Sequence, residues 1–347
     1  MKIAIDAMGG DRAPLSVVEG ALQAGASCSA ELVLVGDEEA LRALLPGGIP
    51  SGVRVVHAPL VVSMEEFGPT AIRKKREASI NVAMRMLAEG EVDCVVSAGN
   101  TSAVVAAAKH FVGLLPGLKR PALAVSLPTS DGRPILLDAG AHPESGALHL
   151  AQSALLAHMY LRVSRGIERP AIALLNIGSE ATKGTRAVQR AFALLHRSSL
   201  NFIGNMEPHE LFTGKADAVV CDGFVGNIVM KMCEGFSEWM MGELGARVAP
   251  RSTELGTALE ELKQGLAYQH VGGAPLLGVK SPVIVAHGRS GRSAVSSAIG
   301  LACRIARERI CGKMADIEQG ASAVDFKQFS AMVFFENFKT RWSSAPK

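Results

Sequence analysis

The sequence lacks the fingerprints of several common catalytic sites. It contains no Gly-x-x-x-x-Gly-Lys-Ser/Thr segment, and Lys183 and Gly184 stand in the wrong order for a phosphate-binding P-loop. Gly9-Gly10 does not fit the Gly-x-Gly-x-x-Gly dinucleotide pattern, and no Gly-x-Ser-x-Gly elbow marks a nucleophilic serine. The nine histidines never pair at the spacing of a zinc site. We therefore expect no cofactor, no metal and no acyl-serine intermediate.

Strong charge and long apolar runs are also missing. The formal net charge is +3 over 347 residues, and no basic stripe is interleaved with the few aromatic residues, which argues against a nucleic-acid partner. No uninterrupted apolar run approaches the ~18 residues expected of a membrane-spanning helix. The chain enters a strand at its first residues, so no signal peptide is expected. These features predict a protein that is soluble or at most lies on a membrane surface, and the cysteines described next predict a cytoplasmic one.

The cysteines follow no spacing typical of a redox or metal-binding motif. The six cysteines lie in apolar surroundings, and no two of them form a Cys-x-x-Cys pair. We interpret them as reduced thiols of the core rather than as redox or metal-binding groups.

One stretch, residues 216–235 (ADAVVCDGFVGNIVMKMCEG), combines a buried strand, a glycine loop and a helix. Residues 218–221 are apolar and β-branched, as in a buried strand. Residues 222–227 are predicted to form a loop whose two glycines turn tightly and approach a ligand. A helix is expected from Ile228. This order points free backbone N–H groups and the positive end of a helix dipole at an anion.

The same order recurs along the chain. Five more apolar strands run into polar, glycine-rich loops at residues 6–11 (DAMGGD), 97–102 (SAGNTS), 138–142 (DAGAH), 176–184 (NIGSEATKG) and 286–291 (AHGRSG). Strands that alternate with helices predict an α/β fold with a mostly parallel, doubly wound sheet. In such a sheet the loops emerge at the carboxyl edge and converge on one crevice. We expect residues 1–347 to form a single α/β domain.

Residues 59–77 resist assignment, but they carry the basic run Arg73, Lys74, Lys75 and Arg76 just before a helix expected at 79–89. Cations are disfavoured at a helix N-terminus. Two interpretations stay open, a solvated charged loop and a landing site for a phosphate or an acidic protein. A further glycine and proline loop is expected at residues 272–278.

Residues 228–269 are predicted to form a helical hairpin that breaks near Pro250. Four leucines in its second helix follow a four-three-four spacing, which is typical of a narrow coiled-coil seam. The seam predicts packing on a second copy of the chain. Methionines and Trp239 offer a face for a lipid surface as an alternative, and plain core packing is the third interpretation.

The predicted crevice is rich in backbone N–H groups, hydroxyls and lysines, and it lacks an activated protein nucleophile. Such a site suits a bound anion that is itself the nucleophile, for example phosphate attacking a thioester. The alternative is that Asp6 and Asp138 cap helices and that His142 or His287 satisfies a loop. The catalytic candidates are Asn100, Lys183, Asp222, Asn227, Lys231 and His287. The candidates for phosphate or substrate binding are Asp6, Gly9, Gly10, Thr101, Asp138, Asn176, Gly178, Gly223, Gly226 and Ser290.

Five segments together resemble the bacterial phosphate acyltransferase (PlsX) family. They are residues 6–11 with Ala13-Pro14, then residues 97–101, 174–178, 221–227 and 272–278, in the order of the family. The likeness extends from residue 1 to about residue 335. Three positions depart from the family's pattern, namely Ser102, His142 and Ser179.

The resemblance implies transfer of a fatty acyl group from acyl carrier protein to inorganic phosphate. The acyl phosphate would serve a downstream membrane acyltransferase that acylates glycerol 3-phosphate in phospholipid synthesis. The resemblance also implies a three-layer α/β/α fold like isocitrate dehydrogenase and phosphotransacetylase, a homodimer, and peripheral membrane association through the hairpin. It gives the basic run a role, because acyl carrier protein is acidic and complementary charge speeds docking.

Two other functions remain open from the sequence. A hydroxy-acid dehydrogenase of the isocitrate or isopropylmalate kind would share the architecture. A non-catalytic scaffold that recruits lipid enzymes through the hairpin belongs to another class. Phosphate-dependent consumption of a carrier thioester separates the acyltransferase from both.

Overall fold

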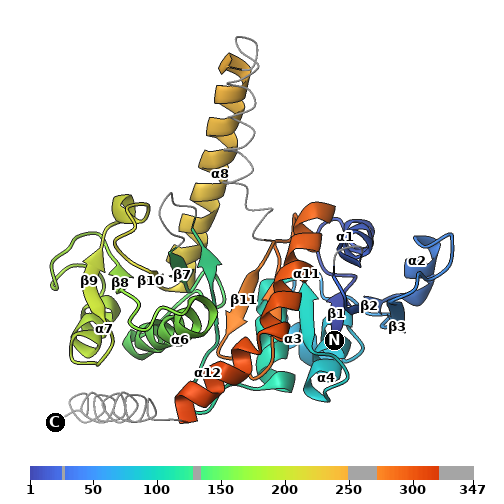
Figure 1. Cartoon of the computed structure of the whole chain (residues 1–347), viewed down its shortest axis with the longest axis horizontal. Helices are drawn as coiled ribbons and strands as arrows, with labels where there is room; N and C mark the ends of the chain where they lie inside the picture. The colour runs from blue at the N-terminus through green and yellow to red at the C-terminus, as the bar shows by residue number, and fades with distance from the viewer. Residues whose placement is uncertain (26–27, 128–133, 249–271, 320–347) are drawn as a thin grey trace.

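The chain folds into two β-sheets with helices packed on their faces (Figure 1). The computed structural model describes residues 1–25, 28–127, 134–248 and 272–319. Most neighbouring strands within these ranges are parallel, so the predicted α/β fold with a mostly parallel arrangement is confirmed. The sequence did not reveal that the strands divide into two sheets.

The first sheet has the strand order β3-β2-β1-β4-β12-β11-β5. Its strands are β1 (Lys2–Asp6), β2 (Glu31–Gly36), β3 (Val53–His57), β4 (Cys94–Ser97), β5 (Ala122–Leu123), β11 (Ala274–Leu277) and β12 (Val283–Val285). From β3 to β12 the strands are parallel, and β11 and β5 are antiparallel to their neighbours. Asp6 pairs with Val35 and with Ser97, which sets the ends of β1, β2 and β4 side by side.

The second sheet has the strand order β6-β7-β10-β8-β9. Its strands are β6 (Val125–Ser126), β7 (Ile135–Leu137), β8 (Ile172–Leu175), β9 (Phe202–Met206) and β10 (Ala218–Val220). Only β6 runs antiparallel to its neighbour in this sheet.

Helices connect most of the strands. They are α1 (Leu15–Gly25), α2 (Glu38–Ala43), α3 (Gly68–Lys74), α4 (Ser79–Ala88), α5 (Thr101–Ala107), α6 (Ala147–Arg165), α7 (Arg186–His196), α8 (Gly223–Val248), α11 (Arg292–Arg307) and α12 (Ile310–Gln319). A π-helical turn, η1 (Ala108–Val112), continues α5, and a 3₁₀ turn, η2 (Pro208–Glu210), follows β9.

Alternate residues of each central strand enter different apolar clusters. Ile3 and Ile5 of β1 lie in a large cluster that also contains Leu137 of β7, whereas Ala4 lies in a second cluster on the opposite face. Strands buried on both faces read as continuous apolar runs rather than as alternating ones. The large cluster takes residues from both sheets, so the two sheets share part of their core.

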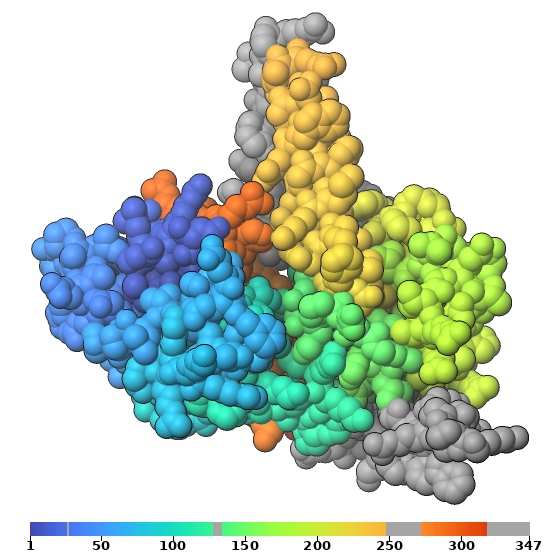
Figure 2. Space-filling view, turned by 180° about the vertical axis from the view of Figure 1, so that it is seen from behind, coloured from blue at the N-terminus to red at the C-terminus, as the bar shows by residue number. Residues whose placement is uncertain are grey.

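Helix α8 rises between the two sheets and projects beyond them (Figures 1 and 2). Near its start, Met230 packs on the second cluster, beside the first sheet. Val229 packs on a third cluster, which contains Leu136, Ala173 and Val219 of the second sheet. The base of α8 therefore contacts both halves of the molecule. The predicted break at Pro250 and the second helix of the hairpin lie outside the described residues.

Two local predictions are wrong, and one segment that the sequence left unassigned contains a helix. Residues 222–227 are not a loop, because α8 already begins at Gly223. Residues 272–278 contain strand β11 rather than only a loop, since the buried residues Ala274–Leu277 pair with β12 and β5. Residues 59–77 contain helix α3, which ends at Lys74, so the first two cations of the basic run lie in the last turn of a helix, where its dipole favours them.

The cysteines also depart in part from the expectation of free thiols. Cys28 and Cys303 form a disulfide that joins the segment after α1 to α11, two helices that pack closely together. Cys94, Cys221, Cys233 and Cys311 are free. Within the ranges given above, none of the helices is long and apolar enough to cross a membrane.

Candidate active site

The N-terminus of α8 lies directly against the turn that follows β7. A Cβ atom on Gly226 would collide with the carbonyl oxygen of Asp138, and one on Gly223 would collide with the carbonyl oxygen of His142. Only a residue without a Cβ permits this approach. The two glycines therefore let the start of α8 lie against the turn after β7, at the carboxyl edge of the second sheet.

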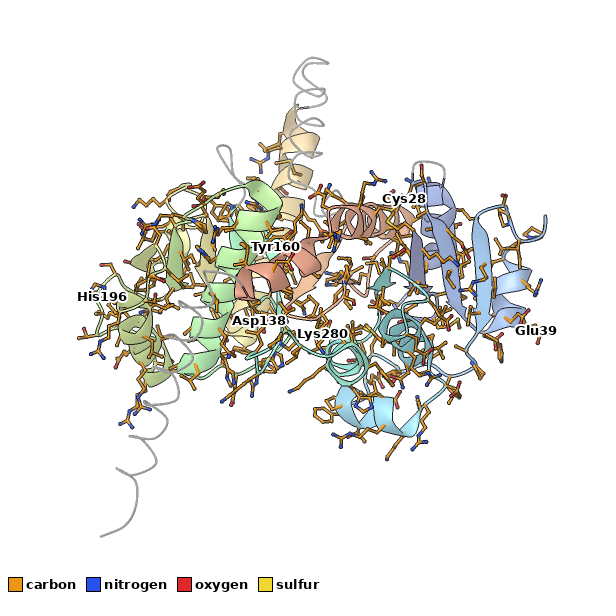
Figure 3. All side chains as sticks on the ribbon, turned by 60° about the horizontal axis from the view of Figure 1, so that its bottom comes forward. Cys28, Glu39, Asp138, Tyr160, His196 and Lys280 are labelled. Carbon is orange, nitrogen blue, oxygen red and sulfur yellow. A yellow bond between two sulfur atoms is a disulfide. The ribbon has the colours of Figure 1, made fainter. Side chains whose placement is uncertain are left out.

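The carboxylate of Asp138 shapes the turn after β7 (Figure 3). Oδ1 accepts hydrogen bonds from the backbone N–H groups of Leu123, Gly140 and Ala141 at 3.0, 3.2 and 2.9 Å. Oδ2 accepts from the N–H of His142 at 2.9 Å. The side chain is buried, and main-chain donors occupy both oxygens. Asp138 therefore organises the turn rather than offering a free carboxylate to a substrate.

The first turn of α8 has few free N–H groups. Asp222 caps the helix, because its Oδ1 accepts from the N–H of Val225 at 2.8 Å. The N–H of Gly223 donates to the carbonyl of His142 at 2.9 Å. Of the three N–H groups before the first intrahelical bond, only that of Phe224 lacks an acceptor in the described part of the chain. The sequence predicted a more open anion site here.

Asp6 ties three segments together at the carboxyl edge of the first sheet. The hydroxyls of Ser79 and Ser97 donate to its Oδ1 and Oδ2, each at 2.6 Å. The N–H of Gly99 donates to the Ser97 hydroxyl at 3.1 Å. Burial raises the pKa of Asp6 above its ordinary value, and the two hydroxyls and nearby main-chain N–H groups partly oppose that rise.

Two glycines lie directly above this carboxyl. A Cβ atom on Gly9 would be 2.5 Å from Oδ2 of Asp6 and 2.8 Å from the N atom of Gly99. A small pocket of ≈ 10 Å³, large enough for about one water molecule, opens beside them and is also lined by Val61 and Val62. Gly9, Gly99 and Asp6 are therefore brought together, as the sequence predicted for the loops after β1 and β4.

The loop after β12 adds His287. Its Nδ1 accepts from the N–H of Arg289 at 3.1 Å. Partial burial lowers the pKa of His287, and the positive charges of Arg289 and Lys231 lower it further, while Asp11 opposes them. The lowered pKa favours the neutral imidazole, and an Nδ1 that accepts a hydrogen bond leaves the proton on Nε2, where it can be donated to an oxyanion.

The same region contains Glu234, one turn beyond Lys231 on α8. Burial raises the pKa of Glu234, and the charge of Arg289 opposes that rise. Its Oε1 is buried and has no hydrogen-bond partner among the described residues. The charges of Arg289 and Lys231 thus act on both Glu234 of α8 and His287 of the loop after β12. Lys231 itself is exposed.

The N-terminus of α11 remains open. Its N-cap is Gly291, which has no side chain to accept from the first turn. The N–H groups of Arg292, Ser293 and Ala294 have no acceptor in the part of the chain that is described. Ser290 precedes the cap and is buried. Its hydroxyl is shielded from solvent and has no hydrogen-bond partner among the described residues. Free N–H groups at a helix N-terminus favour an anion.

The remaining predicted residues have structural surroundings. Gly10, with a φ of +120°, brings the loop after β1 against the carbonyl of Gly288 in the loop after β12. Asn176 shapes the loop after β8, because its Nδ2 donates to the carbonyl of Lys183 at 3.1 Å. Gly178 packs beneath the Lys183 side chain, which is exposed. Thr101 opens α5 and is half-buried.

The basic run is not uniform. Arg73, Lys74 and Arg76 are exposed, but Lys75 turns inward. The Lys75 Nζ donates to the carbonyl of Val61 at 2.7 Å and to Oε2 of Glu66 at 2.6 Å. Lys75 is therefore committed to an internal contact.

The sequence did not indicate four residues of this region as members of the site. Ser97 was visible as the last residue of a strand, but its bond to Asp6 requires β1 and β4 to be neighbours. Ser79, Glu234 and Arg289 carried no signal, because their partners come from other segments.

Comparison with known proteins places the chain in a family. Residues 1–313 match the model of the family described as fatty acid synthesis protein. A phosphate acyltransferase from Syntrophobacter fumaroxidans is 53% identical over 351 residues, which cover 99% of each chain. One from Desulfitobacterium hafniense is 42% identical over 316 residues, covering 89% of this chain and 93% of the relative.

Solved structures with the same fold are more distant. A phosphotransacetylase from Streptococcus pyogenes has a TM-score of 0.59 at 17% identity, covering 89% of this chain and 94% of the other. A 4-hydroxythreonine-4-phosphate dehydrogenase from Klebsiella pneumoniae has a TM-score of 0.53 at 17% identity, covering 88% and 98%. These likenesses support the fold alone, because the two enzymes catalyse different reactions. The family match and the curated relatives show that the chain belongs to the phosphate acyltransferase family.

Proposed function

We propose that the chain transfers a fatty acyl group from the thioester of acyl-acyl carrier protein to inorganic phosphate. The observation that carries this proposal is the position of α8. Gly226 and Asn227 lie against the turn after β7, where a Cβ built on Gly140 is 3.6 Å from that of Asn227. One turn later, the charge of Lys231 adds to burial and to Arg289 in lowering the pKa of His287. Val229 and Met230 pack on clusters beside the second and the first sheet, so the first turns of α8 contact both sheets.

Phosphate is the nucleophile in this proposal, because the nearby cysteines are inert. Burial raises the pKa of the Cys221 thiol well above its ordinary value, and the carboxylates of Asp222 and Asp138 raise it further. Cys94, at the amino end of β4 and so away from the carboxyl edge, is also buried and its pKa is also raised. A thiol that stays protonated is a poor nucleophile. This supports direct attack by phosphate over a covalent acyl-enzyme.

The open N-terminus of α11 and the Lys231 ammonium would hold the phosphate. The N-terminus of α11 directly follows the loop after β12, and the charge of Lys231 acts on His287 of the same loop. The first turn of α8, in contrast, offers only one free N–H group. A phosphate oxygen attacks the carbonyl carbon of the thioester. The carbon–sulfur bond then breaks, and the carrier thiolate leaves and takes a proton from solvent. The Nε2–H of His287 would stabilise the oxyanion that forms on the thioester carbonyl.

The other catalytic candidates have supporting places in this arrangement. Asp222 fixes the start of α8 as its cap. Asn227 borders the turn after β7, and Lys183 is an exposed charge on the second sheet's side of the crevice. Asp6 supports the loops that carry Gly9 and Gly99 from below.

The acidic carrier protein would dock on the exposed cations Arg73, Lys74 and Arg76. The exposed side chains of Leu60, Phe67 and Met64 lie in the adjacent segment and offer apolar contacts. Complementary charge would speed association and make it sensitive to salt. Lys75 is left out of this surface, because its ammonium is bound internally.

The projecting part of α8 would serve a homodimer and a membrane surface. The side chains of Val225, Ile228, Met232, Phe236 and Trp239 are exposed and follow one face at a spacing of three to four residues. An apolar face of this kind is covered by a second copy of the chain or lies in a lipid interface. A peripheral position in the cytoplasm would bring the acyl phosphate to a membrane acyltransferase that acylates glycerol 3-phosphate.

The reaction is tested with purified protein and an acyl carrier thioester. Free thiol should appear only when phosphate is present, and hydroxylamine should trap an equal amount of acyl phosphate as the hydroxamate. Thiol release without phosphate would indicate a thioesterase and contradict the proposal. Sedimentation of the protein alone and with lipid vesicles tests the dimer and the membrane contact separately.

A further inference from the structure

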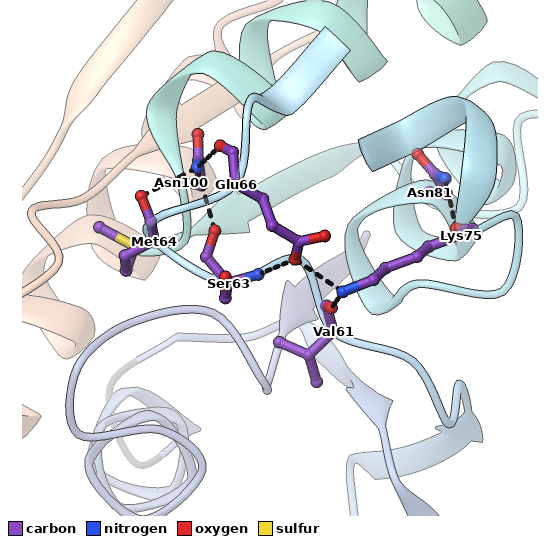
Figure 4. A network of polar contacts seen from close by, with 7 residues as sticks. All are labelled: Val61, Ser63, Met64, Glu66, Lys75, Asn81 and Asn100. Atoms are coloured by element: carbon purple, nitrogen blue, oxygen red, sulfur yellow. Dashed lines mark hydrogen bonds and ion pairs between the residues drawn. The ribbon is translucent and has the colours of Figure 1, made fainter. Parts of the chain in front are cut away.

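The side-chain amide of Asn100 is wholly occupied by internal partners (Figure 4). Its Nδ2 donates to the carbonyl oxygens of Ser63, Met64 and Glu66 at 3.0, 3.2 and 2.8 Å. Its Oδ1 accepts from the N–H of Ala103 at 3.1 Å and so caps α5. Asn100 is buried, with 7% of its surface exposed. No polar atom of this amide is left to face a substrate.

The three carbonyls belong to the segment between β3 and α3, which we call the strap (residues 60–67). A second contact holds the strap from its other side (Figure 4). Lys75 Nζ binds the carbonyl of Val61 and Oε2 of Glu66, and the same Glu66 oxygen accepts from the N–H of Ser63 at 2.8 Å. The side chains of this ion pair are each 33% exposed, whereas Asn100 is buried.

Ser102 fixes the orientation of the Asn100 amide. Its hydroxyl donates to Oδ1 of Asn100 at 2.7 Å and accepts from the N–H of Gly68 at 3.1 Å. A hydroxyl that donates to Oδ1 keeps the oxygen on the side of α5 and the NH₂ group on the side of the strap.

The strap connects loops that the proposed reaction uses. Val61 and Val62 line the pocket beside Gly9 and Gly99. The Met64 side chain reaches the loop after β12, where its Cε is 2.8 Å from a Cβ built on Gly288. The strap therefore spans from the start of α5 to the loop that carries His287. A shift of the strap would change the spacing of those loops.

We infer that Asn100 is a positioning residue, which holds the strap across the rim of the crevice so that the loops around Gly9, Gly99 and His287 keep the spacing needed to bind phosphate. The inference rests on the proposed function, and it replaces the catalytic role that the sequence predicted for Asn100. Loss of the hydrogen bonds from Asn100 to the strap carbonyls should weaken phosphate binding more than it slows the chemical step, because no atom of the amide reaches the reacting groups.

The variant Asn100→Ser separates the two roles of this side chain. Serine still caps α5, but it cannot reach the strap carbonyls. Amide exchange in residues 61–67 should become faster by roughly tenfold or more, the loss expected from about one net hydrogen bond or more. The KM for phosphate should rise by about fivefold or more while kcat changes by less than about twofold and the KM for the carrier thioester is unchanged.

Two further variants keep the test decisive. Ser102→Ala leaves Asn100 in place and removes the hydroxyl that donates to Oδ1 of Asn100 and accepts from the N–H of Gly68. It should produce the same two changes in smaller degree, even if Asn100→Ser folds poorly. Asn201→Ser is the matched control, because Asn201 is an asparagine outside the site whose Nδ2 donates to a single carbonyl, that of Arg169, at 3.1 Å. It should leave strap exchange and both KM values unchanged.

Each outcome decides the inference. Faster strap exchange with an unchanged KM for phosphate would overturn the positioning role. A loss of kcat alone would instead assign Asn100 to the chemical step. Absence of phosphate dependence in the wild-type protein would be a failure of the proposed function, and the exchange experiment would still show whether Asn100 and Ser102 hold the strap.

Discussion

The hydroxyl of Ser79 donates a 2.6 Å hydrogen bond to Oδ1 of Asp6, which joins the first residue of α4 to the last residue of β1. The carboxyl is buried beneath two glycines, and burial raises its pKa. This buried group makes stability depend on pH.

The Asp6→Asn variant should flatten that dependence. The folded pKa lies above the unfolded value of 3.8, so the folded state keeps a proton that the unfolded state has released. Between those two values, stability therefore falls as pH rises, and asparagine removes this term. Ser79→Ala should steepen the dependence, because the lost hydroxyl donor lets the pKa rise further. Denaturant unfolding across the acid range measures both, and an unchanged slope in Asp6→Asn would contradict the assignment.

Lys231→Ala should reduce phosphate affinity and leave the fold intact. The side chain is exposed, so its loss creates no cavity, but it removes a cation whose charge acts on His287. We expect a rise of about tenfold or more in the KM for phosphate, equal to about 1.4 kcal/mol. Lys215→Ala is the control, since Lys215 is an exposed lysine paired with Glu210 on the second sheet. Equal kinetics in the two variants would remove Lys231 from the site.

Charge reversal should separate two neighbouring lysines. Lys74→Glu should raise the KM for the carrier thioester and not that for phosphate, with a larger effect at low salt. Lys75→Glu should instead loosen the segment before α3, because its partner Glu66 would then face a like charge. Steady-state kinetics and proteolysis distinguish the two. A Lys74→Glu enzyme with wild-type carrier kinetics would exclude docking at this surface.

Replacing two glycines of α8 by alanine should change the stability of the protein in opposite directions. Gly226→Ala should destabilise the protein by about 2 kcal/mol or more, because its Cβ would meet the carbonyl of Asp138. Gly235→Ala should stabilise it by about 0.5–1 kcal/mol, since the position is helical with open space around it. Thermal unfolding compares them. Equal effects would mean that α8 does not press on the turn after β7 in solution.

The order of strands and loops was predicted well, because the residues that mark a strand end and the loop after it are neighbours in the sequence. Polar, glycine-rich segments after β1, β4, β7, β8 and β12 stand at strand ends, as predicted. The helix α3 was missed because its apolar residues are few and its N-cap, Phe67, makes no side-chain bond. The strand β11 was missed because Pro275 and two flanking glycines resemble a turn, and only pairing with β5 and β12 makes it a strand.

Residue roles were harder to predict than elements. Asn100 and Lys75 looked available for ligands, but their partners are carbonyls some ten to forty positions away in the sequence. The capping carboxylate of Asp222 closes a helix end that the glycines suggested was open. Arg289 acts on Glu234 through space, although the two residues are 55 positions apart in the sequence. Such contacts depend on packing between segments, which a single sequence does not encode locally.

The most direct measurement follows radiolabelled phosphate through one turnover. The purified protein is mixed with an acyl carrier thioester, and label in the lipid-extractable product is compared with the thiol released. Direct attack predicts one labelled phosphate for every thiol, from the first turnover onward, and a common decrease of both in Lys231→Ala. Thiol released ahead of the label, or without it, would contradict the claim that phosphate itself attacks the thioester.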